Sequence, residues 1–137
     1  MMTNRIISKL DYQRLKKRIE QAKINARVSP TQLMKLVRGV DGATLLDPVK
    51  IPSDVVTMNS VVSLEYIDMD KHLDICLVYP EEADGAHNRI SIFAPLATAL
   101  LGCQRGTVAN LTTPFGSINI RINQILYQPE AAGDFSR

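Results

Sequence analysis

The sequence predicts an α+β protein, in which a short antiparallel helical hairpin of coiled-coil type precedes a small antiparallel sheet carrying one short helix. Two patterns predict this class. Apolar residues recur three and four positions apart between Tyr12 and Val40, the period of a helix, and alternate with polar residues from Val62 onward, the period of a strand. Residues between the two patterns contain two prolines, as linkers do. We therefore expect a helical arm over residues 1–47, a linker over 48–54 and a sheet domain over 55–137.

The first helix is expected to begin after Ser8. Ser8 and Asp11 have the spacing of a capping box, with Asp in place of the usual Glu, so the Ser8 hydroxyl should accept from the backbone N–H three residues on. Beyond this cap, the apolar residues form one narrow seam, which consists of Tyr12, Leu15, Ile19, Ala22 and Ala26. The seam predicts a helix with a single apolar face.

The second helix is expected to begin at Pro30. Ser29 suits the N-cap position, Pro30 suits the first helical position, and Gln32 completes a second capping box. Gly39 and Gly42 each cost about 1 kcal/mol relative to alanine, which leaves the end of this helix beyond residue 38 open. The apolar residues that continue the seam are Leu33, Leu36, Val40 and Ala43.

Charge divides the chain into a basic arm and an acidic body. Residues 12–40 contain eight basic residues against one acid, whereas residues 41–137 contain six basic residues against twelve acids. A basic arm can neutralise nucleic-acid phosphates, but Tyr12 is its one aromatic residue for stacking on bases. A solvated helical face accounts for the same charges.

The sheet domain is expected to contain two hairpins. Residues 62–66 and 73–79 alternate between apolar and polar around a turn at 68–72, and residues 108–112 and 118–127 flank a turn at 114–116. In the last strand the alternation slips by one residue between Ile122 and Ile125. That slip predicts an irregularity in the strand.

Residues 90–102 are expected to form a strand that leads directly into a short helix, with the corner at Ala94. Pro95 disfavours helix at Ala94 and suits the first helical position itself, and Gly102 suits a left-handed stop. If Ile92 points into the core, Phe93 points away from it. Alanine cannot cap the helix, so the corner would be open to a partner's carboxylate. In the alternative, Phe93 covers a second small core and water caps the helix.

The remaining residues argue against an enzyme. His72 and His87 lie in expected loops without a second ligand at metal spacing, and no nucleophile has an attendant base. Cys76 and Cys103 lack Cys-x-x-Cys spacing and read as small packed residues, with one disulfide as the alternative. The sequence indicates no cofactor and no metal. Without an apolar secretion core or a run of about 20 apolar residues, we expect a cytoplasmic protein.

Several runs together resemble one family. They are Val-Val-Thr-Met-Asn-Ser at 55–60, Leu-Val-Tyr-Pro at 77–80, Ile-Ser-Ile at 90–92, Ala-Leu-Leu-Gly at 99–102 and Tyr-Gln-Pro-Glu-Ala-Ala-Gly-Asp at 127–134. With the basic hairpin, they are similar to the Rnk branch of the GreA/GreB transcription elongation factors. The resemblance implies a coiled-coil arm on an FKBP-like body, and a partner in bacterial RNA polymerase at the rim helices of the secondary channel.

The resemblance also implies particular site residues. Gre factors contact polymerase through a polar residue, a small residue and a proline at the strand-to-helix corner, which match Phe93, Ala94 and Pro95, with Ser91 just before them. Because Phe93 is apolar, the contact would be more hydrophobic than in Gre factors. In the arm, Lys23, Arg27 and Lys35 would face the channel.

Transcript cleavage is not implied by the resemblance. Gre factors hold acidic residues at the tip of a long hairpin, where they help a magnesium ion, whereas residues 21–40 of this chain contain no acid. Each helix of the hairpin would also be only about 27 Å long, which is short for reaching the catalytic centre. The resemblance, with the absence of acids at the hairpin tip, therefore implies a polymerase-binding regulator that competes with Gre-type factors without stimulating cleavage.

Two alternatives come from other classes. One is a nucleic-acid-binding protein that acts through the basic arm. The other is an FKBP-type prolyl isomerase, which requires an aromatic-lined pocket, whereas the chain has no Trp and its three phenylalanines, Phe93, Phe115 and Phe135, are dispersed. The label of the Rnk branch refers to nucleoside diphosphate kinase, but nothing in the residues indicates contact with that kinase.

Overall fold

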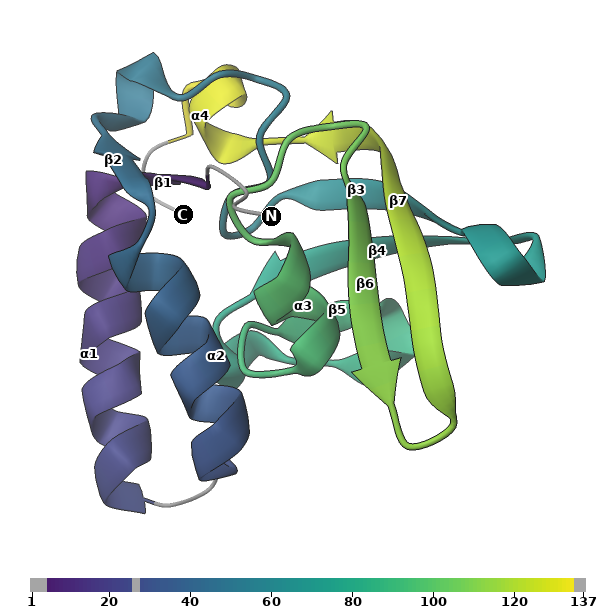
Figure 1. Ribbon diagram of the computed structural model, residues 1–137. Helices are drawn as coiled ribbons and strands as arrows, with labels where there is room; N and C mark the ends of the chain where they lie inside the picture. The colour runs from purple at the N-terminus through teal and green to yellow at the C-terminus, as the bar shows by residue number, and fades with distance from the viewer. Residues whose placement is uncertain (1–4, 26–27, 135–137) are drawn as a thin grey trace.

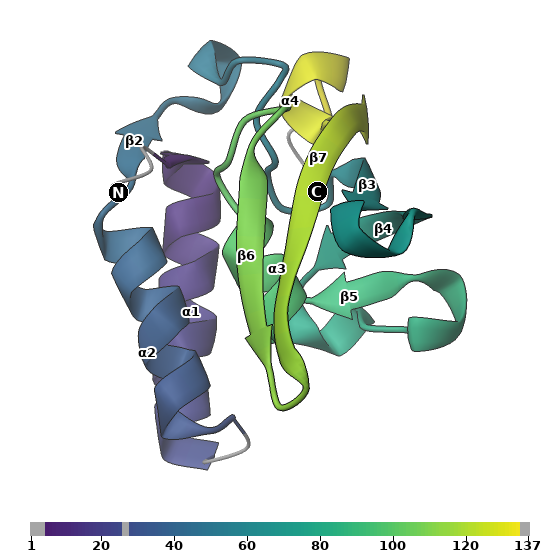
Figure 2. The same ribbon diagram turned by 45° about the vertical axis from the view of Figure 1, so that its right-hand side comes forward.

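The computed structural model describes residues 5–25 and 28–134, and it has the expected α+β class. Two longer helices, α1 and α2, stand beside a curled five-stranded sheet, and the short helix α3 lies between α2 and the sheet (Figures 1 and 2). The helices are α1 (Lys9–Asn25), α2 (Pro30–Asp41), α3 (Pro95–Leu100) and α4 (Pro129–Ala132). The strands are β1 (Ile6–Ser8), β2 (Thr44–Leu46), β3 (Val61–Tyr66), β4 (Lys71–Val78), β5 (Arg89–Ser91), β6 (Val108–Thr113) and β7 (Gly116–Tyr127).

Both predicted helix starts are confirmed, each by half of its capping box. Ser8 Oγ accepts from Asp11 N at 2.9 Å, and Ser29 Oγ accepts from Gln32 N at 3.1 Å, with Pro30 in the first helical position. In each box, the side chain of the last residue, Asp11 or Gln32, forms a hydrogen bond to the body of the protein in place of one back to the cap residue. The Asp11 carboxylate accepts from Met58 N, and the Gln32 amide donates to Thr98, so both side chains connect a helix to the body of the protein.

The return helix α2 continues through Gly39 to Asp41, and Gly42 is its C-cap. The Gly42 N–H donates to Arg38 O at 3.0 Å and the Ala43 N–H donates to Val40 O at 3.3 Å, which closes the last turn. Gly39 is useful here because an added Cβ would lie 3.0 Å from Nη1 of Arg5, whose guanidinium lies against the helix. Ala43, expected in the helical seam, lies just outside the helix and is half-buried.

A small parallel pair of strands, β1 and β2, brackets the two helices and is absent from the prediction. Each strand has three residues, too few to show an alternating pattern. The pair is fastened to the body because Ile6 N donates to Gly102 O at 3.0 Å. Gly102 has φ +79°, and an added Cβ would lie 3.1 Å from Ile6 O, so glycine both ends α3 and admits β1.

The five strands of the main sheet are arranged in the order β5-β4-β3-β7-β6. The two predicted hairpins, β3 with β4 and β6 with β7, are confirmed, and β3 pairs with β7 between them. The prediction of an antiparallel sheet is wrong at one edge, because β5 runs parallel to β4 with Leu77 beside Ile90. The loop 79–88 returns the chain to the start of that edge and permits the parallel pairing.

The slip expected in the last strand is confirmed as an irregularity of register. Leu64 pairs with Ile122, the next residue of β3, Ser63, pairs with Gln124, and Val62 pairs with Ile125. This register gives Asn123 of β7 no partner residue on β3, as in a β-bulge. The bulge returns the side chains of β7 to the face that the alternation requires.

The apolar seams of the two helices are buried in the same core as the sheet. Leu15, Ile19 and Leu36 are each at most 2% exposed. They form one hydrophobic cluster with residues of β3, β4, α3 and β7, and these include Val62, Leu64, Ile75, Leu77, Ala97, Leu100, Ile120 and Ile122. The two helices lie side by side against the body in both views and run in opposite directions (Figures 1 and 2).

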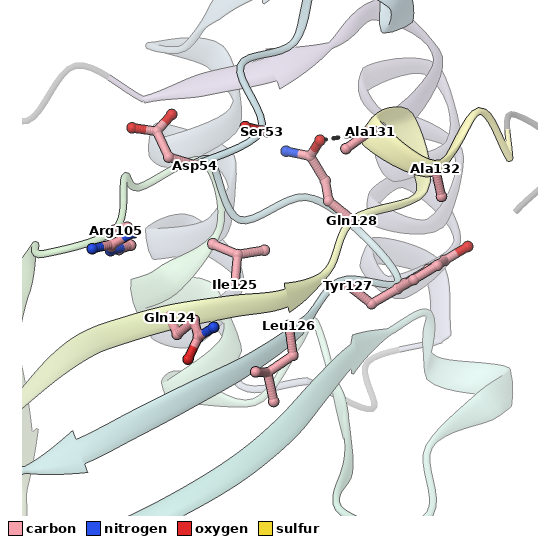
Figure 3. A pocket seen from close by; sticks show the side chains of 10 residues that line it. All are labelled: Ser53, Asp54, Arg105, Gln124, Ile125, Leu126, Tyr127, Gln128, Ala131 and Ala132. Carbon is pink, nitrogen blue, oxygen red and sulfur yellow. Dashed lines mark hydrogen bonds between the residues drawn. The ribbon is translucent and has the colours of Figure 1, made fainter.

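The segment between β2 and β3 is held by the buried side chain of Gln128. Its Nε2 donates to the carbonyls of Pro52 and Val55, each at 2.8 Å, and its Oε1 accepts from Ala131 N at 3.1 Å and caps α4 (Figure 3). One amide therefore fixes the proline-containing stretch to the start of α4.

Within residues 5–25 and 28–134, no helix combines the length and apolar character that crossing a membrane requires.

Candidate functional site

The corner between β5 and α3 is a tight turn built by Ser91. Its backbone carbonyl accepts from Ala94 N at 2.9 Å, and its Oγ accepts from Phe93 N at 3.1 Å. The Ser91 side chain therefore holds the shape of the corner. The turn ends the strand at Ser91 and starts the helix at Pro95, as the sequence predicts.

The side chains of the corner differ in exposure. Ile92 is fully buried, Phe93 and Ala94 are half-buried, and Pro95 is exposed. Phe93 packs against the edge of the core cluster. It is less exposed than strict alternation implies, because β5 ends before it and the turn redirects its side chain.

Ala94 occupies the N-cap position of α3 and makes no side-chain capping bond. The first turn of α3 is instead stabilised through its backbone, where Thr98 N donates to Ala94 O at 3.0 Å. The corner thus presents an exposed proline and a half-exposed aromatic ring at an end of α3 without a side-chain cap. That arrangement suits contact with a partner surface.

Two of the three predicted channel-facing residues of the arm, Lys23 and Lys35, are described by the structure. Lys23 is exposed on α1, with Nζ 3.6 Å from Glu20 Oε2, and Lys35 is exposed on α2. Arg27 lies outside the described residues. The structure places Lys35, which lines a pocket that Pro95 also lines, near the corner.

Much of the positive charge of α1 is paired with acids of other segments. Lys9 Nζ lies 3.3 Å from Asp47 Oδ1, Lys16 Nζ lies 3.2 Å from Asp41 Oδ1, and Arg18 pairs with Glu81 of the body. The Arg18 guanidinium also lies 4.0 Å from the centroid of the Tyr79 ring. The pairing lowers the net charge that this helix offers to an external anion.

Asp11 is a buried carboxylate between α1 and the body, and sequence reasoning assigned it only to a cap. It is 3% exposed; its oxygens accept from Met58 N at 3.2 Å and from the Tyr79 hydroxyl at 3.3 Å. Burial, with the nearby Glu130 carboxylate, raises the pKa of Asp11 from 3.8 to about 7, against the opposing effects of Met58 N–H and Arg14.

The raised pKa predicts that stability falls between pH 5 and pH 8. Between pH 5 and about 7 the folded protein retains the Asp11 proton and the unfolded chain does not, so stability is lost as the pH rises to about 7 and levels off above it. We expect a loss of about 2 kcal/mol in the free energy of unfolding in urea, and Asp11→Asn should abolish it. Exposed Asp74→Asn is the control and should keep the wild-type slope; an equal slope in Asp11→Asn would contradict this assignment.

A pocket of about 420 Å³ lies beside the end of β7 and α4 (Figure 3). Gln124 and Gln128 line it, together with Asp54 and Arg105, whose backbone N donates to Asp54 O at 2.7 Å. Within the described segments no three His, Cys, Asp or Glu residues are grouped as metal ligands require. Both histidines are exposed, but the expectation that His72 lies in a loop is wrong, because β4 begins at Lys71 and His72 pairs with Glu65 of β3. Cys76 and Cys103 are not joined by a disulfide.

Comparison with known proteins matches the body to one family. Residues 51–127 match the family described as "Transcription elongation factor, GreA/GreB, C-term". The "Regulator of nucleoside diphosphate kinase" of Escherichia coli K12 is 35% identical over 97 residues, which cover 70% of this chain and 71% of that protein. A "Transcription elongation factor GreA" of Chloroherpeton thalassium is 32% identical over 106 residues, which cover 77% of this chain and 64% of that protein.

A solved structure has a similar fold over most of the chain. The "Prokaryotic transcription elongation factor GreA/GreB from Nitrosomonas europaea" aligns with a TM-score of 0.74 and 32% identity, and the alignment covers 92% of this chain and 100% of that one. Fold and sequence together define a regulator related to transcription elongation factors. The chain belongs to the GreA/GreB family, and its similarity to the Escherichia coli regulator agrees with the Rnk-like motifs of its sequence.

Proposed function

We propose that this protein binds bacterial RNA polymerase at the rim helices of the secondary channel and regulates transcription there as a non-enzymatic, cytoplasmic factor. The observation that carries the proposal is the family match over residues 51–127, because the match includes the whole β5–α3 corner. The relatives are named as transcription elongation factors and as a regulator, and the resemblance to Gre factors implies polymerase as the partner.

The docking surface in this proposal is the corner at residues 91–95. Pro95 is exposed and Phe93 and Ala94 are half-exposed, so a partner helix would bury apolar surface on binding. Ser91 keeps the turn rigid through its two hydrogen bonds, which lowers the ordering cost of binding. A contact centred on an aromatic ring and a proline is mainly hydrophobic.

The helical hairpin supports occupancy of the channel entrance without cleavage. Residues 21–40, which span its tip, contain no Asp or Glu to hold a magnesium ion. Helix α1 has 17 residues and is about 25 Å long, and its apolar seam is buried against the body. The hairpin would place Lys23 and Lys35, with Arg27, at the entrance, where it excludes longer factors.

Transcript cleavage in a backtracked elongation complex tests this proposal. Addition of the protein alone should leave the basal cleavage rate unchanged. Increasing amounts should progressively suppress cleavage that a Gre factor stimulates, because the two proteins compete for one site. The measurement is the fraction of shortened transcript against time on denaturing gels.

Two outcomes would contradict the proposal. Cleavage stimulated by this protein alone would show that the hairpin tip supplies the missing chemistry. Unchanged Gre-stimulated cleavage at saturating protein would show that the two factors do not share a site.

A further inference from the structure

A second pocket, of about 460 Å³, lies between α2, α3 and β6 and is lined by three cationic residues. Arg5 contributes one charge from just before β1, and Lys35 and Arg38 contribute two from α2. No acidic side chain of the described segments lines the pocket. The cavity therefore concentrates positive charge where the N-terminal helical part of the chain meets a body whose residues 41–137 carry twice as many acids as bases.

Arg5 is held in place by its neighbours. Its Nη1 donates to Thr98 O at 2.8 Å and to Leu101 O at 3.3 Å, at the end of α3. The missing Cβ of Gly39 leaves room for the guanidinium, since an added Cβ would lie 3.0 Å from Nη1. Arginine has five donors, and within the described residues the Nε and Nη2 donors have no partner. A fixed guanidinium with free donors is prepared to bind an anion.

Lys35 and Arg38 are three residues apart on α2, a spacing that places them on the same face of a helix. Both are exposed, and neither has an ion-pair partner among the residues that the structure describes. By contrast, Lys9, Lys16 and Arg18 of α1 are paired with acids.

The rest of the lining is apolar or weakly polar. Pro95 and Ala99 of α3 and Leu111 of β6 provide an apolar wall, and Asn110 provides an amide whose Nδ2 donates to Asn119 Oδ1. The volume lies within the range of small-molecule sites, about 300–1,000 Å³, which also combine apolar walls with a few charged groups. The space exceeds what a lone phosphate fills.

We infer that this pocket binds a small phosphate-bearing ligand up to the size of a nucleotide. Lys35 and Arg38 bind the phosphates together with the free donors of Arg5, and the wall of Pro95, Ala99 and Leu111 receives the apolar part of the ligand. Guanidinium and ammonium groups are the usual protein partners of phosphate, through charge-assisted hydrogen bonds. This inference does not depend on polymerase binding.

Isothermal titration of the full-length protein with inorganic pyrophosphate, ATP and adenosine tests the inference. Pyrophosphate or ATP should bind saturably at one site, and adenosine should bind far more weakly. The double variant Lys35→Ala/Arg38→Ala should weaken the binding of pyrophosphate and of ATP by at least about tenfold, because it removes charged hydrogen bonds to the phosphates. Tighter binding of ATP than of pyrophosphate would assign the apolar wall to the nucleoside.

The matched control removes the same charge elsewhere. Lys17→Ala/Lys50→Ala replaces two exposed lysines that do not line the pocket, and it should change the affinity by less than about twofold at physiological ionic strength, where distant charges are screened. The absence of saturable binding of both phosphate ligands would overturn the inference. An equal loss of affinity in the control variant would overturn it also, since general charge rather than the pocket would then hold the ligand.

Discussion

Leu15→Ala will destabilise the whole protein by about 2–5 kcal/mol, the usual cost of removing a fully buried leucine side chain. Leu15 lies in α1, is 0% exposed and belongs to the cluster that also contains the buried residues of the sheet. Removing its methyl groups leaves a cavity between the helix and the body. For a domain whose total stability is of order 5–15 kcal/mol, the loss is large.

Thermal unfolding followed by far-ultraviolet and tyrosine near-ultraviolet circular dichroism measures this effect. Three of the four tyrosines, Tyr66, Tyr79 and Tyr127, lie in or directly beside the sheet, so the near-ultraviolet signal reports mainly on the body, although Tyr12 lies in α1. Far-ultraviolet signals are dominated by α1 and α2. Both probes should report one shared transition at a lower temperature. Ile24→Ala, at a side chain that is 84% exposed on the same helix, should change stability by no more than about 0.5 kcal/mol.

Two separate transitions would show that the hairpin unfolds independently of the body. If Leu15→Ala melts the helices early and leaves the tyrosine transition unchanged, the hairpin is an independent arm that rests on the body without sharing its core.

The local structure could be predicted from the sequence wherever one short pattern determines it. Ser29 and Pro30 start α2, Pro95 starts α3 and Gly102 ends it, because each of these residue types has a narrow backbone preference. The bulge in β7 was visible because Ile122 and Ile125 break a strict alternation. These signals depend on neighbours in the sequence and on nothing farther away.

Long-range arrangement was less accessible to sequence reasoning. The seam of Leu15 and Ile19 showed that one face of α1 is buried, but it could not show that the body covers part of it. The direction of β5 was also missed, since its three residues carry no register signal and the loop before it is long enough for either orientation.

The residues of the second pocket are distant in the sequence, and this explains why the pocket was not predicted. Arg5, Arg38 and Pro95 meet only because β1 passes Gly102 and α2 packs beside α3. One local signal existed. Gly39 lies within α2, where a glycine costs about 1 kcal/mol relative to alanine, and such a glycine indicates a close approach by another group. Asp11 gave a similar but weaker signal, as an acid beside an apolar seam.

Phe93→Asp should abolish detectable binding to RNA polymerase. An aromatic residue at the centre of an interface commonly contributes about 2–4 kcal/mol, and a carboxylate in its place would also have to be desolvated. Because Phe93 is half-buried, its replacement also tests the fold. Pro95→Lys, at an exposed position of the same corner, should weaken binding while leaving the thermal transition unchanged.

The most direct measurement is co-elution of the purified protein with bacterial RNA polymerase core in size-exclusion chromatography. Wild type should co-elute, a Gre factor should displace it, and Phe93→Asp and Pro95→Lys should elute separately from polymerase. Phe115→Asp makes the same chemical change at a ring that is 100% exposed on the β6–β7 turn, and it should co-elute like wild type. Failure of the wild type to co-elute, or co-elution of folded Phe93→Asp and Pro95→Lys at the wild-type level, would contradict docking through this corner.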